Sequence, residues 1–115
     1  MYEALMEGNH IPTLTEIFSE DVVWHLLGAA PLSGDHRGRE AVFAAMRQFE
    51  GSVQHELHDV LGNDEHAVAL LRATGSRKDK QYNAMEIDVF HVREGKITEF
   101  WSFSEDQSMT DEYWS

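Results

Sequence analysis

The sequence predicts a single α+β domain in which a few helices are followed by a curved, mainly antiparallel sheet. Helical spacing of apolar residues is confined to the first half of the 115 residues, whereas four strand-like segments follow one another in the second half. Helices that precede a run of strands are typical of a helix layer packed on a sheet. We therefore expect a cone spanning residues 1–115, with the sheet wrapped around the helices and a central pocket for a small molecule.

Two short helices are expected before the first strand. Residues 2–7 are typical of the last turns of a helix, which Gly8 terminates. Pro12 stands where a second helix begins, because its missing N–H is harmless in a first turn. Residues 19–21 end that helix, so Phe18 is placed on its apolar side.

One strand and one long helix are expected next. Residues 22–27 (Val-Val-Trp-His-Leu-Leu) predict a strand buried on both faces, and residues 28–37 predict a loop rich in Gly, Pro, Ser and Asp. The longest helix begins near Glu40, whose negative charge suits a first turn, and Gly51 ends it. One face of this helix must be covered, because apolar residues recur there at helical spacing: Val42, Phe43, Met46 and Phe49.

The second half predicts an antiparallel meander of four strands, at residues 53–61, 66–74, 82–92 and 96–104. A polar, mostly basic tip at residues 75–80 separates the second strand from the third. The tight turn Glu94-Gly95 separates the last two strands. The acidic residues after Ser104 predict a solvated tail.

Composition excludes several classes of function. There are 9 Lys and Arg against 21 Asp and Glu, a formal net charge of -12, which argues against nucleic acid and against anionic membrane surfaces as partners. Cysteine is absent, which excludes disulfides, thiolate nucleophiles and cysteine-ligated metals. No apolar run approaches the roughly 18 residues of a membrane span, and no signal peptide is visible, so we expect a cytoplasmic protein.

Three segments together resemble a known family: residues 21–25 (DVVWH), 34–42 (GDHRGREAV) and 90–101 (FHVREGKITEFW). Their order and spacing resemble the SnoaL-like polyketide cyclases and the ketosteroid isomerase relatives of the nuclear transport factor two-like superfamily. The resemblance implies a cone-shaped α+β barrel, often a homodimer, with an apolar pocket that holds one or two buried acids.

Asp88 is the first candidate for a catalytic residue. It lies in the middle of a predicted strand, where Asp has a poor propensity. Alternation places it on one face with Glu86, Phe90 and Val92, although periodicity alone does not decide which face lines the pocket. The resemblance implies that Asp88 points into the pocket with a raised pKa, stays protonated and donates a hydrogen bond to a substrate oxyanion. The alternative is an Asp paired with Lys or Arg on a neighbouring strand.

Tyr2 falls where the isomerases carry a second donor to the oxyanion, but chain ends fray, and this favours the alternative of an exposed or merely packed tyrosine. The positions where relatives carry a catalytic carboxylate are occupied here by Leu26 and Ser102, neither of which can abstract a proton. Any base must therefore come from elsewhere. Glu86 is a candidate because it shares a face with Asp88, whereas His25 should face away from Leu26.

The aromatic residues are core residues by default, and the resemblance places a subset of them around the pocket. The substrate-binding walls it implies are Trp24, Leu26, Phe43, Phe90, Phe100 and Ser102. Trp101 and Phe103 would then face the outer side of the sheet or a dimer partner. The segment His55-Glu56-Leu57-His58 is one residue too short for a zinc helix and reads as a strand, so neither a metal nor a cofactor is expected.

Three functions remain open. The first is a cofactor-independent isomerase, cyclase or dehydratase that acts on a small apolar carbonyl compound by proton transfer. The second is a non-catalytic protein that binds an apolar metabolite, which the missing bases favour. The third is a dimerising interaction module that uses the outer face of the sheet, which would require an exposed apolar patch there.

Overall fold

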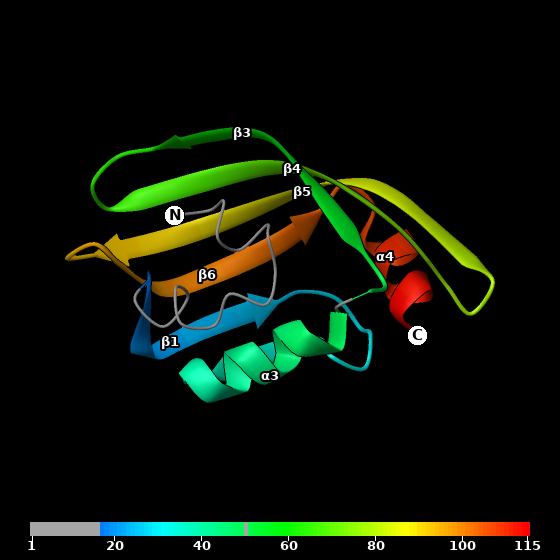
Figure 1. The fold of residues 1–115 in the computed structure, drawn as a ribbon, viewed down its shortest axis with the longest axis horizontal. Helices are drawn as coiled ribbons and strands as arrows, with labels where there is room; N and C mark the ends of the chain where they lie inside the picture. Colours follow the sequence, from blue (N-terminus) through cyan, green and yellow to red (C-terminus); the bar gives the residue numbers. More distant parts are fainter. Residues whose placement is uncertain (1–16, 50) are drawn as a thin grey trace.

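The computed structural model describes residues 17–49 and 51–115. They form a six-stranded sheet in the order β2-β1-β6-β5-β4-β3, with helix α3 beside β1 and helix α4 near the end of β6 (Figure 1). The elements are β1 Phe18–Leu26, β2 Gly34–Arg37, α3 Arg39–Phe49, β3 Gln54–Gly62, β4 His66–Arg77, β5 Lys80–Arg93, β6 Lys96–Ser104 and α4 Gln107–Trp114. The predicted α+β class is confirmed.

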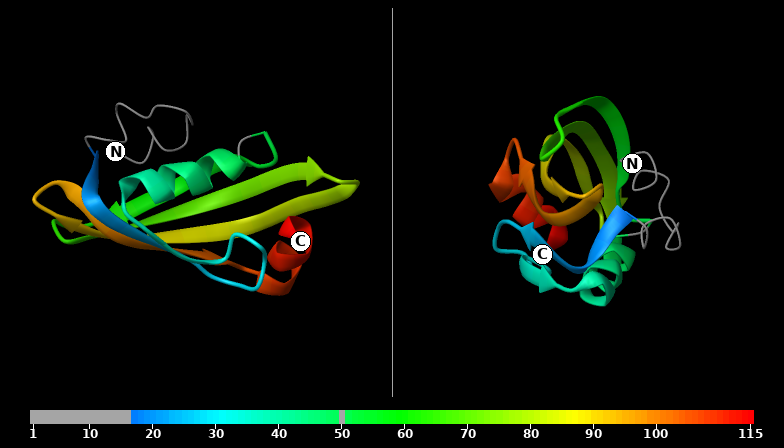
Figure 2. Two further views of the ribbon diagram at one scale, coloured as in Figure 1. Left: turned by 90° about the horizontal axis from the view of Figure 1, so that it is seen from below. Right: turned by 90° about the vertical axis from the view of Figure 1, so that its left-hand side faces the viewer.

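The sheet is mainly antiparallel, as the sequence predicts. Strands β3 to β6 form the expected meander, each antiparallel to the next. Strand β1 lies parallel to β6, and β2 pairs antiparallel with β1 at the edge. Figure 2 shows that the strands are bowed and that α3 lies along one face of the sheet. We call the face that α3 covers the concave face and the opposite one the convex face.

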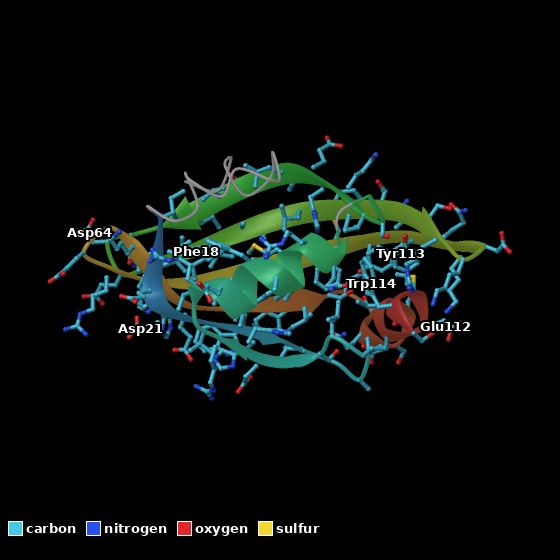
Figure 3. All side chains as sticks on the ribbon, turned by 60° about the horizontal axis from the view of Figure 1, so that its bottom comes forward. Phe18, Asp21, Asp64, Glu112, Tyr113 and Trp114 are labelled. Carbon is cyan, nitrogen blue, oxygen red and sulfur yellow. The ribbon has the colours of Figure 1, made fainter. Side chains whose placement is uncertain are left out.

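Helix α3 covers the sheet with the apolar side that its spacing predicts. Val42 and Phe43 are buried, and the Phe43 ring stacks on Phe18 with the ring centroids 5.8 Å apart. At the other end of the helix, the Phe49 ring meets Trp114 edge-on at 4.5 Å. Figure 3 shows Phe18 and Trp114 beside opposite ends of α3. Contacts with residues distant in sequence therefore hold both ends of this helix.

The predicted boundary between helix and strand near Phe18 is wrong. Residues 18–21 belong to β1, and Phe18 pairs with Ile97 of β6, while the register shifts between Phe18 and Val23. The local pattern is helical, but pairing with a strand from the other end of the chain decides the conformation. The helix expected over residues 2–7 lies outside the described residues, and so does the helix expected from Pro12 except for its end, from Ile17 on.

Two further expectations for the first half are corrected. The residues expected to form a loop include β2, residues 34–37, an edge strand whose polar sequence carries no alternating apolar signal. Strand β1 is fully buried only on its concave face, at Val22 and Trp24, whereas Val23 and His25 on the convex face are half-buried. Its β-branched composition suits either a half-buried or a fully buried strand, so composition alone cannot separate the two.

The polar tip expected at residues 75–80 is mostly strand. Strands β4 and β5 continue to Arg77 and from Lys80, which leaves only Lys78 and Asp79 in the turn. Both turn residues have positive φ, 48° and 63°, as a two-residue type I′ hairpin requires. Because this turn lacks the usual Asn-Gly signal, the sequence did not reveal how short it is.

The solvated tail predicted after Ser104 is instead helix α4. Its first turn is capped by Asp106, whose side chain accepts a hydrogen bond from the backbone N–H of Met109 at 3.0 Å. Tyr113 is buried and stacks on Tyr82 of β5 at 5.0 Å. The Arg77 guanidinium lies 5.4 Å from the Trp114 ring. The acidic residues of this segment suggested a solvated tail, but the helix also has an apolar side, which is buried against the sheet.

Candidate functional site

A polar strip crosses the middle of the concave face. We define it by five residues that register and alternation place on this face: His55, Glu86, Asp88, Ser102 and Ser104. Asp88 stands directly opposite Ser102, and Glu86 stands directly opposite Ser104. Periodicity alone did not decide whether Asp88 faces the interior. It does, because Phe90, two residues further along β5 and on the same face, is buried in the core.

The polar strip lies between two apolar clusters. On one side is an aromatic cluster, which we define as Phe18, Trp24, Phe43, Phe90 and Phe100. On the other side is a tyrosine cluster, which we define as Ala73, Tyr82, Ala84 and Tyr113. Carboxylates next to such surfaces interact strongly with neighbouring charges, because less water screens them. The arrangement suits chemistry in which a proton moves beside an apolar compound.

Both carboxylate oxygens of Glu86 have hydrogen-bond partners. The Tyr82 hydroxyl donates to its Oε2 at 2.7 Å, and Nε2 of His55 lies 3.2 Å from its Oε1. The Tyr82 hydroxyl also lies 2.9 Å from Oγ1 of Thr110 on α4. Burial, together with the charge of Glu86, raises the pKa of Tyr82 to about 12. Tyr82 is therefore a neutral donor at any physiological pH, and it holds Glu86 in one position.

His55 reaches Glu86 from two strands away. It pairs with Ala73 of β4, and Ala73 pairs with Ala84 of β5. The β4 residue directly opposite Glu86 is Leu71, so His55 approaches Glu86 diagonally, from the position where β4 and β5 carry only methyl groups. Burial lowers the pKa of His55, but the hydrogen bond to Glu86 and the charges of Glu86 and Asp88 outweigh it and raise that pKa. His55 therefore belongs electrostatically to the same group as both carboxylates.

Asp88 lies on the concave face between small neighbours. The residues opposite it on the adjoining strands are Ala69 and Ser102, so neither adjoining position carries the Lys or Arg that the alternative interpretation would need. Oγ of Ser102 accepts a hydrogen bond from the Trp24 indole Nε1 at 3.0 Å. Ser102 then has its own hydroxyl hydrogen available to donate, which makes it a directional group beside Asp88.

The predicted wall residues occupy the expected face. Trp24 and Phe43 are each 7% exposed, while Phe90 and Phe100 are almost completely buried. Trp24 stacks on Phe100 with centroids 5.4 Å apart, so these rings pack against one another as well as facing the interior. Leu26 is half-buried and pairs with Ser102, at the margin of the polar strip. Their binding of a substrate stays a prediction.

Two residues that contribute to this site, His55 and Tyr82, were not among the predicted site residues. His55 was considered only as part of a zinc pattern, although alternation along its strand already placed it on one face with Leu57. Tyr82 was treated as the start of a strand, although its spacing of four from Glu86 places both on one face. Tyr2 lies outside the described residues, and its role as a donor stays a prediction.

His25 lies on the convex face, as expected from its position next to Trp24. Its Nδ1 and Nε2 atoms lie 2.7 Å from Asp35 Oδ1 and 2.5 Å from Glu99 Oε2. Its ring stacks on Trp101 at 4.9 Å. Burial opposes protonation of His25, but these two carboxylates raise its pKa overall. His25 therefore takes part in an ion-pair network with Asp35 and Glu99, on the opposite side of the sheet from Asp88.

The described residues also include one open hollow, of about 650 Å³, lined by residues 51–54, 74–76 and 81–83. It does not include Asp88, Glu86 or the aromatic cluster, so the central apolar pocket stays a prediction. Over residues 17–49 and 51–115, no group of three or more His, Asp or Glu side chains is arranged to hold a metal ion. In the same part of the chain, no helix has the length and apolar character needed to span a membrane.

Comparison with known proteins shows which family and which solved structures this chain resembles. Residues 1–100 match the SnoaL-like domain. Bal32a, from a soil-derived mobile gene cassette, is 31% identical, with a TM-score of 0.91 over 99% of this chain and 90% of that chain. A search of curated proteins found no significant match.

Two more distant structures share the fold. IdmH from Streptomyces antibioticus, a candidate polyketide cyclase, is 21% identical, with a TM-score of 0.71 over 95% of this chain and 89% of that chain. A candidate isomerase from Rhodopseudomonas palustris is 17% identical, with a TM-score of 0.73 over 96% of this chain and 87% of that chain. At these identities the likeness concerns the fold alone.

Proposed function

The chain belongs to the SnoaL-like domain family, and from this premise we propose that it catalyses proton transfer on a small apolar carbonyl compound. The proposed reaction is an isomerisation, cyclisation or dehydration that needs no cofactor. Such a reaction requires a group that removes a proton next to the carbonyl and a donor that stabilises the oxyanion formed.

One observation carries the proposal: Glu86 and Asp88 stand side by side on the concave face between two apolar clusters. Asp is unfavourable in the middle of a strand, and carboxylates are uncommon on an interior face. A structural role alone would be served as well by an apolar residue. Two acids placed there are therefore best explained by chemistry.

The roles follow from position. Asp88 serves as the acid or hydrogen-bond donor, with the Ser102 hydroxyl beside it. Trp24, Leu26, Phe43, Phe90 and Phe100 are the proposed walls, and Tyr2 is the proposed auxiliary donor. The neutral walls favour an apolar compound over a charged one, because burying an unpaired charge beside them would be costly.

A binding screen tests the proposal. Ketones, lactones and aromatic polyketides are added to the labelled protein, and shifts of the backbone amide signals of Leu26, Asp88 and Ser102 are followed by NMR. We expect at least one class to shift these signals, and any hit is then assayed for turnover. If no class moves them, the small-molecule function is contradicted.

The Asp88→Asn variant separates an enzyme from a binder. We expect turnover to fall on the order of a hundredfold while affinity for the compound stays nearly unchanged. Asp59→Asn is the matched control, because Asp59 is exposed on β3 and pairs on the convex side. An equal loss of affinity and turnover in Asp88→Asn would instead support the non-catalytic binder.

We also propose that a second copy of this chain covers the convex face. Ile87 and Phe103 are directly paired in the centre of the sheet, and each is 41% exposed. Leu61, 56% exposed, lies on the same face. Because a two-fold contact brings a patch against its own copy, this central apolar patch would be matched by an apolar patch on the partner.

A further inference from the structure

We propose that His55 is the general base of the concave site and that Glu86 is its positioning residue. This inference rests on the proposed function and supplies what the sequence lacked, since the positions of the family carboxylates hold Leu26 and Ser102. It also narrows the substrate class to carbon acids, compounds with an acidic C–H next to a carbonyl group.

The contact between His55 and Glu86 has the form of a carboxylate–histidine dyad. Nε2 of His55 lies 3.2 Å from Oε1 of Glu86, and the two side chains are 34% and 18% exposed. Among the described residues, Nδ1 of His55 has no hydrogen-bond partner. When the Nε2–H group donates a hydrogen bond to the carboxylate, the proton of the neutral ring stays on Nε2. The lone pair of Nδ1 is then free to take a proton from a substrate.

Glu86 is better suited to holding the histidine than to acting as the base itself. Its Oε2 accepts a hydrogen bond from the Tyr82 hydroxyl at 2.7 Å, so both of its oxygen atoms take part in hydrogen bonds. Tyr82 is in turn anchored to Thr110 of α4. The chain Thr110–Tyr82–Glu86–His55 therefore orients the imidazole, while neither Glu86 oxygen is left without a partner to take a substrate proton.

The small residues of the neighbouring strands make this reach possible. His55 projects from β3 over Ala73 of β4 towards β5, where Ala84 leaves equal room. A larger side chain at Ala73, which is completely buried, would fill the path of the imidazole. The histidine is thereby placed on the same face as Asp88, whose charge, when it is ionised, also favours the imidazolium.

The proposed step is balanced without any further reagent. The substrate C–H bond breaks, its proton moves to Nδ1 of His55, and its electron pair forms the enolate. Asp88, in its protonated form, donates a hydrogen bond to the enolate oxygen. The proton on Nδ1 then returns to a different carbon of the same compound, which completes an isomerisation and regenerates the neutral imidazole.

The experiment uses 5-nitrobenzisoxazole, a flat apolar probe that has an acidic ring C–H although it lacks a carbonyl group. Removal of its ring C–H by a base breaks the N–O bond and releases a coloured nitrophenolate. We expect the full chain to accelerate this reaction, with a rate that rises with pH as His55 loses its proton. His55→Ala should reduce the rate on the order of a hundredfold, whereas His58→Ala, an exposed histidine of the same strand, should leave it unchanged.

Glu86→Gln tests the positioning role. Its amide oxygen can still accept the Nε2 proton but carries no charge, so the midpoint of the pH–rate profile should move to lower pH while activity above the midpoint is largely retained. Nitrogen NMR of the wild-type protein supplies a measurement that needs no variant. The neutral His55 ring should carry its proton on Nε2, and a proton on Nδ1 would overturn the inference.

Failure of the inference and failure of the proposed function give different results. Binding is measured separately with the analogue methylated at the reactive carbon, which cannot react. If the analogue binds but His55→Ala keeps the full rate and Asp88→Asn abolishes it, Asp88 is the base and the His55 inference is wrong while the function stands. If the analogue does not bind at all, the apolar pocket is contradicted, and the inference with it.

Discussion

The Trp24 indole donates a hydrogen bond from Nε1 to the Ser102 hydroxyl oxygen at 3.0 Å, which joins the parallel strands β1 and β6 beneath the polar strip. Trp24 is 7% exposed, so its N–H has little access to water. Because Ser102 Oγ is the acceptor in this bond, the hydroxyl hydrogen of Ser102 stays available to donate to another group. One contact thus serves the core and the candidate site.

Ser102→Ala should cost about 1–3 kcal/mol of unfolding free energy, because it leaves the buried Trp24 N–H without an acceptor. Trp24→Phe removes the donor as well as ring volume. The double variant should lose less than the sum of the two single losses, because the indole donor is then no longer stranded. Urea unfolding of all four proteins gives this coupling, and strict additivity would show that the bond contributes nothing.

Gly75→Ala should destabilise the fold by about 1–3 kcal/mol through overpacking. A Cβ at Gly75 would stand 2.2 Å from the Ser52 carbonyl oxygen and 2.7 Å from the Tyr113 hydroxyl. The change would therefore push apart β4, the turn after α3 and helix α4. Thermal unfolding measures the loss, and exposed Ser76→Ala in the same strand is the control, expected within about 0.5 kcal/mol of wild type. An unchanged Gly75→Ala melting temperature would contradict the tight packing of α4.

The ion pairs of His25 should make stability depend on pH in a defined direction. Asp35 and Glu99 raise the pKa of His25 above 6.5, so the folded state binds its proton more tightly than the unfolded state does. This stabilisation is complete below pH 6.5 and is lost as pH rises through the raised pKa. On the acid side it persists below the ordinary range for Asp35, because the hydrogen bond to His25 lowers the pKa of that carboxyl.

Melting temperatures of wild type and His25→Gln between pH 5.5 and 8.5 measure this effect. The wild-type advantage should be largest at the acid end of the range and should shrink towards the alkaline end. His66→Gln is the control, because His66 contacts the His91 ring but no carboxylate among the described residues. A difference between wild type and His25→Gln that does not vary with pH would show that the network contributes packing only.

Phe103→Asp should weaken self-association at least about tenfold, because it places a charge in the centre of the proposed contact between two copies. Light scattering after size-exclusion chromatography, over a range of concentrations, measures the mass. Val60→Asp is the matched control, since Val60 is similarly exposed, at 42%, but its strand pairing places it on the concave side. A wild-type protein that stays monomeric throughout this range would contradict the proposed dimer.

Much of the site could be predicted because alternation along a strand is a local property. It placed Glu86 and Asp88 together with Phe90, and it placed His25 away from Trp24, before any fold was known. The same rule applied to β3 would have placed His55 on a face with Leu57. What alternation could not supply was the distance from His55 to Glu86, since that depends on β4 lying between their strands and on the small residue Ala73 standing opposite His55.

The sequence by itself determined the α+β class, the apolar side of α3 and the four strands of the meander, because each depends on the spacing of side chains within one segment. Only the tertiary structure decided that Phe18 is in a strand, that residues 34–37 form β2 and that residues 107–114 form a docked helix. In these segments the local pattern is weak or misleading. Their conformation comes from backbone pairing and apolar contacts with partners far away in the chain, and such partners exist only once the sheet has formed.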